Sequence, residues 1–476
     1  MKAALVPLVP NKNMKDIAHE IFREYDIRGA YPEKLNEQVA HLIGKALGSE
    51  IILVGQNTCY LAWDGRLSSP SLRDALASGI CSTGCHVHLI GACPTAVTFW
   101  TIKQNGQSCA MITGSHNPKQ DNGIKIAVAG SPRSGEDIQV LLSRIKLNLF
   151  KEGKGELFDA SYLIEAYQNA LTQHLKLDRP LTVVLDAGNG IGGPIACEAL
   201  KQLGANVIEV ACEVDGNFPL HHPDPAKTKN LKWLSDSVIQ HQADLGIALD
   251  GDADRIGVVD HEGNPILPDR LSLLFIEDIL KKQGKQTILF DVKCTELLTT
   301  YTQKFGGEPK MIATGHTSMK RAIKETNAAF ATELSGHILF NDAHAIGVDD
   351  GIYAGLRLCQ LISQSTISLQ ERLAKFPNLI STEEIQITVE EDNKFSLMQL
   401  LTNNCFKEQS IDRTDGIRAK FSNGWVLVRA SNTTPCLTVR IEAQDQAALT
   451  SIALSTLAEL QSQAPKLDLA ELKQLC

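Results

Sequence analysis

The sequence predicts an α/β protein with largely parallel β-sheets and a smaller α+β unit at the C-terminus, and three observations lead to this prediction. Short apolar runs alternate with stretches of helical periodicity through about three quarters of the chain, as is typical of parallel sheets with crossing helices. Several apolar runs end in loops rich in Gly, Ser or Asp, and functional loops lie at the carboxyl ends of parallel strands. The C-terminal part differs, because Asn423-Gly424 joins two apolar runs and is a strong hairpin signal.

The predicted elements follow in chain order. We expect strands over 109–112, 181–185 and 244–249, and helices over 194–203 and 231–240. In the C-terminal unit we expect strands over 385–389, 416–421, 425–429 and 437–442, and helices over 394–403 and 446–460. With 476 residues, and about 100–200 residues per domain, the chain holds about three or four domains. The expected domains are 1–160, 161–265, 266–377 and 378–476.

Composition narrows the class of partner and the compartment. The net charge of -9 disfavours a nucleic-acid partner, which needs a basic surface, but allows a small phosphorylated ligand at a local basic site. No run approaches the roughly 20 apolar residues of a membrane span. The N-terminal apolar stretch is broken by Pro7 and Pro10 and is too short for a signal peptide. We therefore expect a cytoplasmic protein with no membrane partner.

The 12 cysteines are scattered and form no C-x-x-C pair. The densest group of possible zinc ligands consists of Cys81, Cys85, His86, His88 and Cys93. Its spacing matches no common zinc finger or ribbon, so we interpret these residues as part of a helix end and the next strand. So many free thiols indicate a reducing compartment.

A first polar loop, Thr113-Gly114-Ser115-His116-Asn117-Pro118, follows the apolar run 109–112. Glycine before a serine at a strand end allows the hydroxyl to project from a tight turn, and Asn-Pro favours a defined exit from that turn. A projecting serine suits a nucleophile or a carrier of a phosphoryl group, although a helix N-cap would also use serine.

A second loop, Asp250-Gly251-Asp252-Ala253-Asp254-Arg255, follows the run 244–249. In an extended loop, positions i, i+2 and i+4 point the same way, so the three carboxylates would converge. Converging carboxylates repel each other unless a cation lies among them, and oxygen ligands suit magnesium. The alternative is a solvated acidic turn, and the spacing favours the cation.

Two further polar loops suit a sugar phosphate. Thr332-Glu333-Leu334-Ser335-Gly336-His337 offers a carboxylate, a hydroxyl and an imidazole for sugar hydroxyls. The segment 429–435 begins with Arg429, whose guanidinium matches the geometry of phosphate, and continues with Ser431, Asn432 and Thr433 as further donors. A polar loop and an ordinary hairpin are the alternatives for these two segments.

The segment Gly188-x-Gly190-x-x-Gly193 formally matches a dinucleotide-binding fingerprint, with Glu209 about twenty residues further on. Glu209, however, lies within an apolar run rather than past its end. We therefore treat this reading as the minor one.

The four polar loops, in this order, resemble those of the α-D-phosphohexomutase superfamily, specifically its bacterial phosphomannomutase/phosphoglucomutase type. The resemblance extends over almost the whole chain through further motifs, which are Phe22–Gly29, Asp64-Gly65-Arg66, Asp215–Pro219 with His221-His222-Pro223, Asp291–Thr295 and Thr314-Gly315-His316. In this family the segment around Gly188 belongs to the scaffold of the second domain. One departure is Thr332, where many relatives have glycine before the glutamate.

The resemblance implies three similar α/β domains with mixed, mostly parallel sheets and a smaller C-terminal α+β domain, arranged around a central cleft. Each domain would contribute one loop: the phosphoserine loop, the metal loop, the sugar loop and the phosphate loop. It also implies an enzyme that interconverts hexose 1-phosphate and hexose 6-phosphate, with mannose or glucose as the sugar. A phosphoserine enzyme and a 1,6-bisphosphate intermediate would carry the reaction.

The resemblance further implies the roles of individual residues. The catalytic group would comprise Ser115, Lys125, His316, Arg28 and Arg255. Substrate would bind to Tyr25, Lys293, Glu333, Ser335, His337, Arg429, Ser431, Asn432 and Thr433. Magnesium would bind to Ser115, Asp250, Asp252 and Asp254, and a hexose 1,6-bisphosphate would act as activator. Lys125 and His316 are both candidates for the general acid or base.

Three alternatives stay open at this point. The same loops could act on glucosamine or N-acetylglucosamine phosphates, they could serve a phosphatase, or the chain could be a non-catalytic sugar-phosphate sensor. We expect hexose phosphates as the only partners and a monomer in solution.

Overall fold

The computed structural model describes residues 17–432 and 434–476, which form two compact units. The first unit runs as far as Leu271 and also contains Ala329–Gln370. The second contains Ser272–Ala328 and Glu371–Cys476. The N-terminal apolar stretch with Pro7 and Pro10, and Thr433 of the phosphate loop, lie outside the described residues.

The first sheet of the first unit has the strand order β1-β5-β4-β2-β3-β7, with β6 beside β5. Its strands are β1 (Ile27–Ala30), β2 (Thr58–Trp63), β3 (His86–Ala92), β4 (Ser108–Ile112), β5 (Asp121–Val128), β6 (Ser131–Pro132) and β7 (Leu157–Asp159). Strands β2, β3, β4 and β7 pair in parallel, whereas β5 pairs antiparallel with β1, β4 and β6. The sheet is therefore mixed, with a parallel centre.

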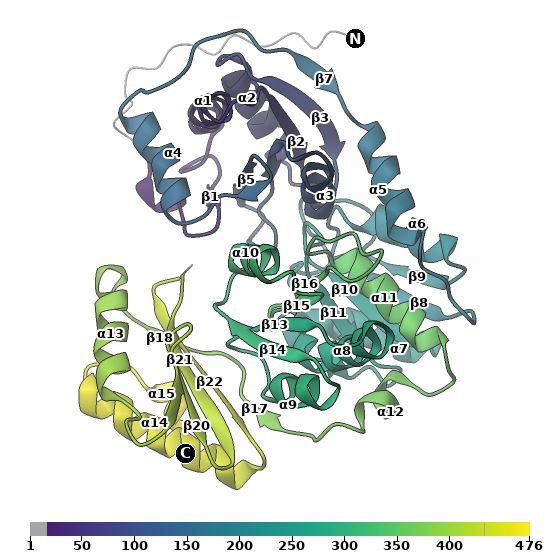
Figure 1. Ribbon diagram of the computed structural model, residues 1–476, viewed down its shortest axis with the longest axis vertical. Helices are drawn as coiled ribbons and strands as arrows, with labels where there is room; N and C mark the ends of the chain where they lie inside the picture. Colours follow the sequence, from purple (N-terminus) through teal and green to yellow (C-terminus); the bar gives the residue numbers. More distant parts are fainter. Residues whose placement is uncertain (1–16, 433) are drawn as a thin grey trace. The chain divides into compact units, whose positions relative to one another are not determined.

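Helices cover both faces of this sheet (Figure 1). They are α1 (Glu37–Leu53), α2 (Ser69–Cys81), α3 (Thr95–Asn105) and α4 (Glu136–Lys146), followed by α5 (Tyr162–Thr172). The chain moves from β2 to β3 and then back past β2 to β4. Right-handed crossovers therefore place α2 and α3 on opposite faces. Helices α1 and α2 approach closely through Gly44 and Gly79, because a Cβ atom on Gly79 would lie 2.1 Å from the carbonyl oxygen of His41.

The second sheet repeats this topology with the order β12-β11-β10-β8-β9. Its strands are β8 (Thr182–Asp186), β9 (Asn206–Val210), β10 (Leu245–Leu249), β11 (Ile256–Val259) and β12 (Pro265–Ile266), and its helices are α6 (Gly193–Gln202) and α7 (Lys232–His241). Strands β8, β9 and β10 are parallel, and β11 and β12 are antiparallel additions. The first unit also contains β15 (Phe330–Thr332), β16 (Ile338–Phe340) and α11 (Gly351–Ser363).

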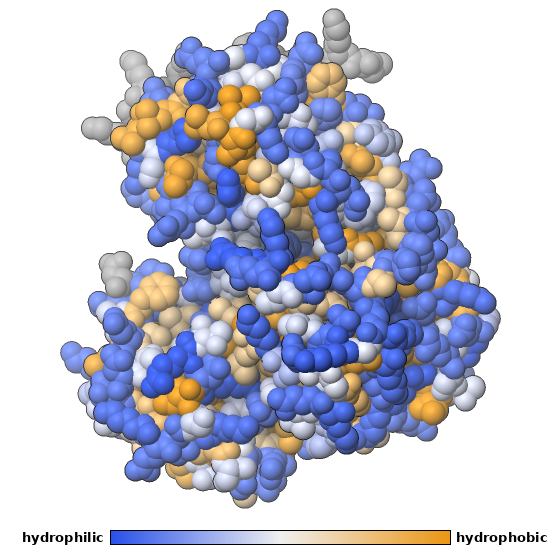
Figure 2. Space-filling view, viewed as in Figure 1, coloured by the Kyte–Doolittle hydropathy of each residue, from blue (hydrophilic) through white to orange (hydrophobic). Residues whose placement is uncertain are grey.

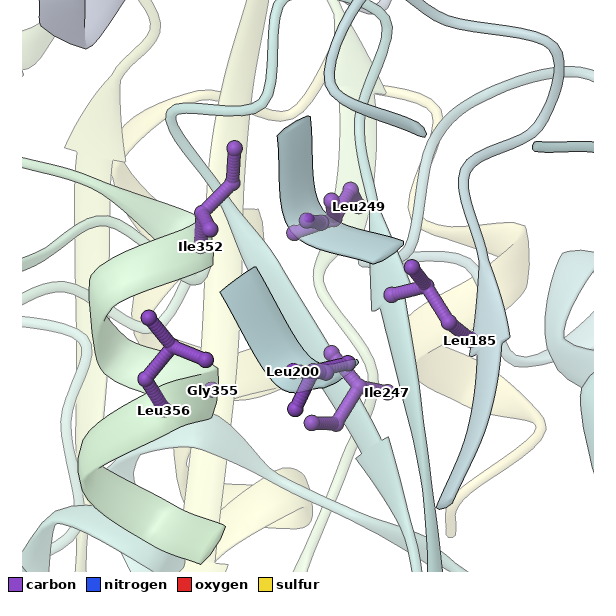
Figure 3. Close-up of a pocket in the computed structure, with 8 residues that line it drawn as sticks. Leu185, Leu200, Ile247, Leu249, Ile352, Gly355 and Leu356 are labelled. Carbon is purple, nitrogen blue, oxygen red and sulfur yellow. The ribbon is translucent and has the colours of Figure 1, made fainter. Parts of the chain in front are cut away.

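A small apolar cavity of about 10 Å³ lies among α6, β10 and α11. Figure 3 shows its lining residues, in which Ile352, Gly355 and Leu356 of α11 face Leu200 and Ile247. It is far too small for a sugar or a cofactor, and its lining side chains are all apolar, so it is a packing defect rather than a ligand site.

The second unit begins with the α/β order again. It contains most of α8 (Pro268–Gln283), then β13 (Thr287–Asp291), α9 (Leu297–Lys304), β14 (Glu308–Ile312) and α10 (His316–Thr326). Strands β13 and β14 pair in parallel. The order strand–helix–strand–helix–strand thus occurs three times along the chain, ending in β4, β10 and β15. This confirms the prediction of three similar α/β domains.

The C-terminal part of the second unit is an antiparallel sheet with helices, as predicted. After α12 (Leu369–Leu373) come β17 (Ile380–Ser381), β18 (Ile385–Thr388), α13 (Lys394–Asn404), β19 (Ser410–Asp412), β20 (Ile417–Phe421), β21 (Gly424–Ala430), β22 (Cys436–Ala443), α14 (Gln446–Gln463) and α15 (Ala470–Lys473). The strand order is β17-β22-β21-β20-β19, with β18 beside β22. Helices α13 and α14 pack against β21 and β22, and their apolar side chains share one core.

The predicted hairpin forms between β20 and β21, but Gly424 is needed for close packing and not for a positive φ in the turn. Phe421 pairs with Gly424, which leaves Ser422 and Asn423 as the loop. None of these loop residues, nor Gly424, has a positive φ. Glycine is required at 424 because a Cβ atom there would lie 2.2 Å from the carbonyl oxygen of Glu442.

The surface is mostly hydrophilic and the cysteines are unpaired, in line with the expectations from the composition. On the face shown in Figure 2, hydrophilic side chains cover most of the surface and hydrophobic ones form separate patches. No helix in the described part of the chain is both long and apolar enough to cross a membrane. All 12 cysteines are free thiols; ten are buried, Cys81 is half-buried and Cys476 is exposed. The arrangement of the four domains around a central cleft stays a prediction.

Candidate active site

Ser115 lies in the loop between β4 and β5, and its hydroxyl contacts the aspartate loop. Its Oγ donates a hydrogen bond to Asp250 Oδ2 at 2.8 Å, and its backbone N donates to Thr113 Oγ1 at 2.8 Å. Ser115 is buried and has a φ of 49°, in the left-handed region. That conformation costs a residue with a side chain roughly 1–2 kcal/mol, so backbone strain lies at the residue predicted to react.

The glycine before Ser115 is needed for packing rather than for conformational freedom. Gly114 has no positive φ, contrary to the reason given from the sequence. A Cβ atom on Gly114 would lie 2.4 Å from Cζ of Arg66. The guanidinium therefore lies directly against the backbone of the loop. Ser115 caps no helix, because it lies in a turn between two strands.

The three aspartates converge as predicted, but by a turn and not by an extended loop. Leu249 pairs with Ile256, so residues 250–255 form the loop of a hairpin between β10 and β11. Ala253 in this hairpin has a φ of 60°. One oxygen each of Asp250, Asp252 and Asp254 lies within 4.8 Å of the others, and all three side chains are fully buried.

This donor set fits a hard divalent cation. All three ligands are carboxylate oxygens, as magnesium prefers, and buried like charges need a compensating cation. Asp252 Oδ1 has no hydrogen-bond partner among the described residues. Burial, followed by the charges of Asp252 and Asp254, raises the pKa of Asp250 well above its usual value.

Lys125 supplies positive charge to the same cluster. It lies on β5 opposite Met111 of β4, and its Nζ donates to Asp252 Oδ2 at 2.7 Å and to Asp254 Oδ2 at 2.6 Å. Burial alone would lower the pKa of Lys125, but the two carboxylates raise it above its usual value. Although burial would raise the pKa of Asp252, the Lys125 ammonium holds it well below its usual value.

The sugar loop lies against the metal loop in the first unit. Arg255 Nε donates to His337 Nε2 at 3.0 Å, and its backbone N donates to Asp250 Oδ1 at 3.1 Å. His337 Nδ1 lies 3.6 Å from Asp254 Oδ1. Within the loop, Ser335 Oγ donates to Glu333 Oε2 at 3.1 Å. The structure therefore brings six predicted residues of two loops together, which are Asp250, Asp254, Arg255, Glu333, Ser335 and His337.

Thr332, the departure from the family pattern, occupies an ordinary strand position. It is the last residue of β15, pairs with Ile338 and is buried without a positive φ. A side chain is therefore accommodated there. Gly336 is the loop residue that must be glycine, since its φ is 95° and a Cβ atom would lie 2.6 Å from the carbonyl oxygen of Ile256.

Arg28 also lies beside the serine loop. It is on β1, and its Nη1 donates to Asn117 Oδ1 at 2.6 Å while Nη2 donates to Asp26 Oδ2 at 2.5 Å. Tyr25 is half-buried in the segment just before β1.

The remaining predicted residues lie in the second unit, where Lys293 and Glu384 form an ion pair. Lys293 Nζ lies 3.2 Å from Glu384 Oε1 and 4.0 Å from Asp291 Oδ2. Burial alone would raise the pKa of Glu384, but the charges of Lys293, Arg440 and Arg429 lower it. Several cations thus face one region of this unit, which suits an anionic group.

Arg429 and the loop before α10 share one carboxylate. Asp415 Oδ2 accepts from Arg429 Nε at 3.0 Å and from the backbone N of Thr314 at 3.1 Å. His316 is the first residue of α10, two positions after Thr314. In the phosphate loop, Ser431 Oγ is 2.7 Å from Thr434 Oγ1, and Asn432 is half-buried.

The glycines of the dinucleotide-like segment are explained by packing. A Cβ atom on Gly190 would lie 2.8 Å from the carbonyl oxygen of Gly251, in the metal loop. One on Gly193 would lie 2.1 Å from the carbonyl oxygen of Cys212. Glu209 is exposed and pairs with Lys201 at 2.6 Å. These contacts account for the spacing without a nucleotide.

Sequence reasoning missed Thr95, whose Oγ1 donates to Asp252 Oδ2 at 2.6 Å. The two residues are 157 positions apart, and Thr95 has no flanking pattern that could signal the contact. It also gave no role to Arg66, although the Asp64-Gly65-Arg66 motif had been noted as part of the family resemblance.

The five possible zinc ligands between Cys81 and Cys93 form no ligand cluster in the described part of the chain.

Four family models match the chain in succession. The phosphoglucomutase/phosphomannomutase α/β/α domains I, II and III match residues 19–151, 162–263 and 267–379, and the C-terminal domain of the same family matches residues 384–458. The matches thus extend over most of the chain.

Individual proteins agree with these matches. A phosphomannomutase/phosphoglucomutase of Pseudomonas syringae pv. tomato is 42% identical over 98% of this chain and 99% of its own length. A phosphoglucomutase of Neisseria meningitidis is 41% identical over 92% of this chain and 96% of its own. The crystal structure of a phosphoglucomutase/phosphomannomutase family protein from Burkholderia thailandensis has a TM-score of 0.90 and 38% identity, covering 95% of this chain and 99% of that one.

Proposed function

This chain belongs to the phosphoglucomutase/phosphomannomutase family, and we propose that it interconverts hexose 1-phosphates and hexose 6-phosphates of mannose and glucose through a phosphoserine at Ser115. The observation that carries the proposal is the 2.8 Å hydrogen bond from Ser115 Oγ to Asp250 in a cluster of three buried carboxylates. A reactive oxygen held at a cation site is what phosphoryl transfer requires.

In the first half-reaction, a free hydroxyl of a hexose monophosphate attacks the phosphorus on Ser115. The bond from phosphorus to Ser115 Oγ breaks as the bond to the sugar oxygen forms, which gives a 1,6-bisphosphate. The hydroxyl proton passes to a base. His316 and Lys125 are the candidates for proton transfer, but Lys125, whose pKa Asp252 and Asp254 raise despite its burial, starts protonated and suits the acid rather than the base. After the bisphosphate turns over, its other phosphoryl group returns to Ser115, which regenerates the phosphoenzyme.

The charged residues of the first unit would stabilise the transferring group. Magnesium held by Asp250, Asp252, Asp254 and Ser115 Oγ would supply positive charge to the phosphoryl oxygens when bound. Arg255, beside His337, and Arg28, beside Asn117, are placed to neutralise further oxygens. Because the transition state spreads charge over these oxygens, such positioning supplies most of the catalysis.

The substrate would be held by its sugar hydroxyls and its unreacting phosphate. Glu333, Ser335 and His337 offer acceptors and donors for hydroxyls. Lys293, Arg429, Ser431, Asn432 and Thr433 would bind the phosphate, and Tyr25 is a further candidate for binding the substrate. A hexose 1,6-bisphosphate would activate the enzyme by phosphorylating Ser115. We expect a cytoplasmic monomer.

The test combines mass spectrometry with a coupled assay. The purified protein should carry the mass of one phosphoryl group at Ser115 and should convert hexose 1-phosphate only with magnesium. Ser115→Ala should lose at least about a thousandfold in kcat, whereas the exposed Ser462→Ala control should not. Full turnover by Ser115→Ala would overturn the proposal. Absence of turnover by the unmodified protein would also overturn it and would favour the alternative of a non-catalytic sugar-phosphate sensor.

A further inference from the structure

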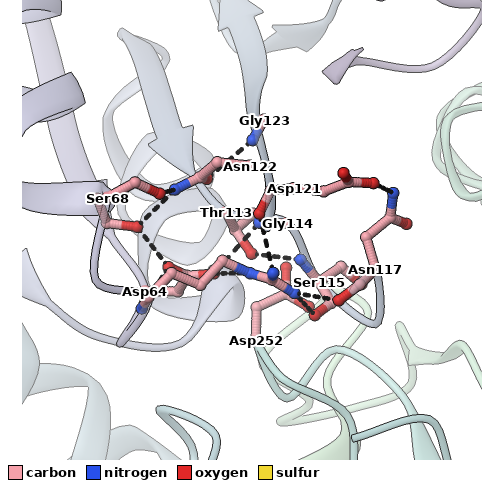
Figure 4. A network of polar contacts seen from close by, with 12 residues as sticks. Asp64, Ser68, Thr113, Gly114, Ser115, Asn117, Asp121, Asn122, Gly123 and Asp252 are labelled. Carbon is pink, nitrogen blue, oxygen red and sulfur yellow. Dashed lines mark hydrogen bonds and ion pairs between the residues drawn. The ribbon is translucent and has the colours of Figure 1, made fainter. Parts of the chain in front are cut away.

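The guanidinium of Arg66 is buried beneath the serine loop and bonds to the loop's backbone. Arg66 follows β2, and its side chain is 1% exposed. Its Nη1 donates to the carbonyl oxygens of Pro118 at 2.7 Å and Asp121 at 2.9 Å. Its Nη2 donates to those of Ser115 at 2.7 Å and Asn117 at 2.7 Å. Figure 4 shows Ser115, Asn117 and Asp121 of this loop in one network of polar contacts.

These bonds use all the Nη donors of the side chain. The two Nη atoms of arginine carry four hydrogens, and four carbonyl oxygens accept from them. No Nη hydrogen remains for a phosphoryl oxygen. Arg66 therefore differs from Arg28 and Arg255, because it has no Nη donor left with which to bind the phosphoryl group directly.

Asp64 completes the arrangement from the other side. Its Oδ2 lies 3.3 Å from Arg66 Nε and accepts from the backbone N of Gly114 at 3.2 Å. Its Oδ1 accepts from the backbone N of Arg66 at 3.0 Å and from Ser69 Oγ at 2.6 Å. A buried guanidinium is costly unless it is paired and hydrogen-bonded. Asp64 supplies the opposite charge, and four carbonyl oxygens satisfy the two Nη atoms, whereas Nε meets Asp64 as an ion pair without a hydrogen bond.

The hydrogen bonds of Asp64 and Arg66 hold the backbone on both sides of Ser115, the residue with the left-handed φ. Asp64 binds the N–H of Gly114 before Ser115, and Arg66 binds the carbonyl of Ser115 itself. The left-handed conformation of Ser115 persists only where its surroundings impose it, and these two contacts do so. In that conformation the hydroxyl meets Asp250.

We infer that Arg66 is a positioning residue for phosphoryl transfer, which fixes the backbone of Ser115 so that its oxygen faces the aspartate cluster without itself touching the phosphoryl group. The inference rests on the proposed function. Because a misplacement of about 1 Å can cost a hundredfold in rate, loss of Arg66 should slow the transfer far more than it weakens substrate binding.

The experiment compares Arg66→Ala and Arg66→Lys in the full-length protein. Arg66→Ala should lower kcat by about a hundredfold or more, with KM changed less than about threefold. Arg66→Lys should be almost as slow, because one ammonium cannot reach four carbonyl oxygens. Guanidinium ion, added well below its denaturing concentration, should raise the kcat of Arg66→Ala at least tenfold. Methylammonium should raise it less.

Arg133→Ala is the matched control. Arg133 directly follows β6 of the same sheet; its side chain is 17% exposed, and it pairs with Glu50 at 2.5 Å rather than with the serine loop. It should lose stability but keep its kcat and show no response to guanidinium. If Arg66→Ala behaves like this control, Arg66 is merely structural and the inference is wrong. If Arg66→Lys keeps full activity, the charge alone suffices and the positioning role is also wrong.

Two further results separate the inference from its premise. If the unmodified protein shows neither turnover nor phosphate on Ser115, the proposed function fails. If it is active and the Arg66 variants are too, only the inference fails. If Arg66→Ala does not fold, Asp64→Asn provides the same test. This substitution removes the negative charge that orients Arg66, while asparagine keeps the shape of the aspartate side chain. It should lower kcat about tenfold at nearly constant KM, and an unchanged kcat would contradict the inference.

Discussion

Asp415 binds Arg429 through one carboxylate oxygen, which also accepts the backbone N–H of Thr314. The arginine proposed to clamp phosphate is therefore held by the same group that holds the loop before His316. A phosphate would meet a guanidinium whose Nε is already occupied and whose orientation is fixed.

We predict that Arg429→Ala raises KM for every hexose phosphate by about ten- to a hundredfold, since charge-assisted hydrogen bonds contribute about 1.5–3 kcal/mol. The effect on kcat should be smaller. Steady-state kinetics would measure both, with the exposed Arg413→Ala as control. Unchanged KM values would mean that this arginine does not bind phosphate.

Asp252→Asn should raise the magnesium concentration needed for half-maximal activity by about ten- to a hundredfold and slow the chemical step. Asp252 contributes to the carboxylate cluster and also accepts from Thr95 and Lys125. A magnesium titration of activity measures the effect. Asp236→Asn, on the exposed face of α7, should leave the titration unaltered. Identical titrations for the Asp252 variant and the unmodified protein would rule out metal binding by this loop.

The range of substrates should include both mannose and glucose. The bisphosphate must bind in two orientations, so Glu333 would read hydroxyls that exchange places when the sugar turns over. Mannose and glucose differ only at C2, and we expect kcat/KM values for their 1-phosphates within about tenfold, or 1.4 kcal/mol. N-acetylglucosamine 1-phosphate should be much poorer. A preference of several hundredfold between mannose and glucose would show that C2 is read.

Gly355→Ala should stabilise the first unit by about 0.5–1 kcal/mol, because glycine in a helix interior is unfavourable. The new Cβ would lie 3.1 Å from Ile247 Cδ1, which can shift into the small cavity beside it. Urea unfolding at constant m-value measures the change. On the same helix, Gly351→Ala should destabilise, since its Cβ would lie 2.5 Å from the carbonyl oxygen of Arg255. A stability loss for Gly355→Ala would mean that Ile247 cannot move.

His221 should contribute stability at low pH only. Its Nε2 lies 2.9 Å from Asp186 Oδ2; burial alone would lower the pKa of His221, but Asp186 raises it above its usual value. A raised pKa in the folded state means that the stabilisation is complete below about pH 6.5, the unfolded value, and is lost as pH rises through the folded pKa. The stability difference between the unmodified protein and His221→Gln should therefore shrink from pH 6 to pH 9. The exposed neighbour variant His222→Gln should show no such trend, and a constant difference for His221→Gln would contradict the prediction.

The strands that end at functional loops could be predicted because each is a short apolar run closed by turn residues. The runs at 109–112 and 244–249 became β4 and β10 with boundaries shifted by at most one residue. The convergence of Asp250, Asp252 and Asp254 was also predictable, although the reason was a hairpin turn. The family models then supported the α/β assignment of the first three domains.

Contacts between segments that are distant in the chain are not marked by any pattern in the sequence. Thr95 reaches Asp252 from the start of α3, and Arg66 reaches the loop carbonyls from the end of β2. Both contacts depend on how one element packs on another, and a side chain that bonds to backbone carbonyls imposes no residue type on its partners. The left-handed φ of Ser115 likewise arises from these contacts rather than from its neighbours in sequence.

The uneven exposure of the thiols makes the protein convenient to label. Alkylating reagents react with the thiolate, and burial raises the pKa of Cys81 and Cys405 to about 11 and that of Cys85 to about 12. A thiol of pKa 11 holds a few hundredfold less thiolate at neutral pH than an ordinary cysteine. A maleimide dye should therefore attach to Cys476 first, which gives a fluorescent reporter on the C-terminal sheet unit without removal of any other cysteine.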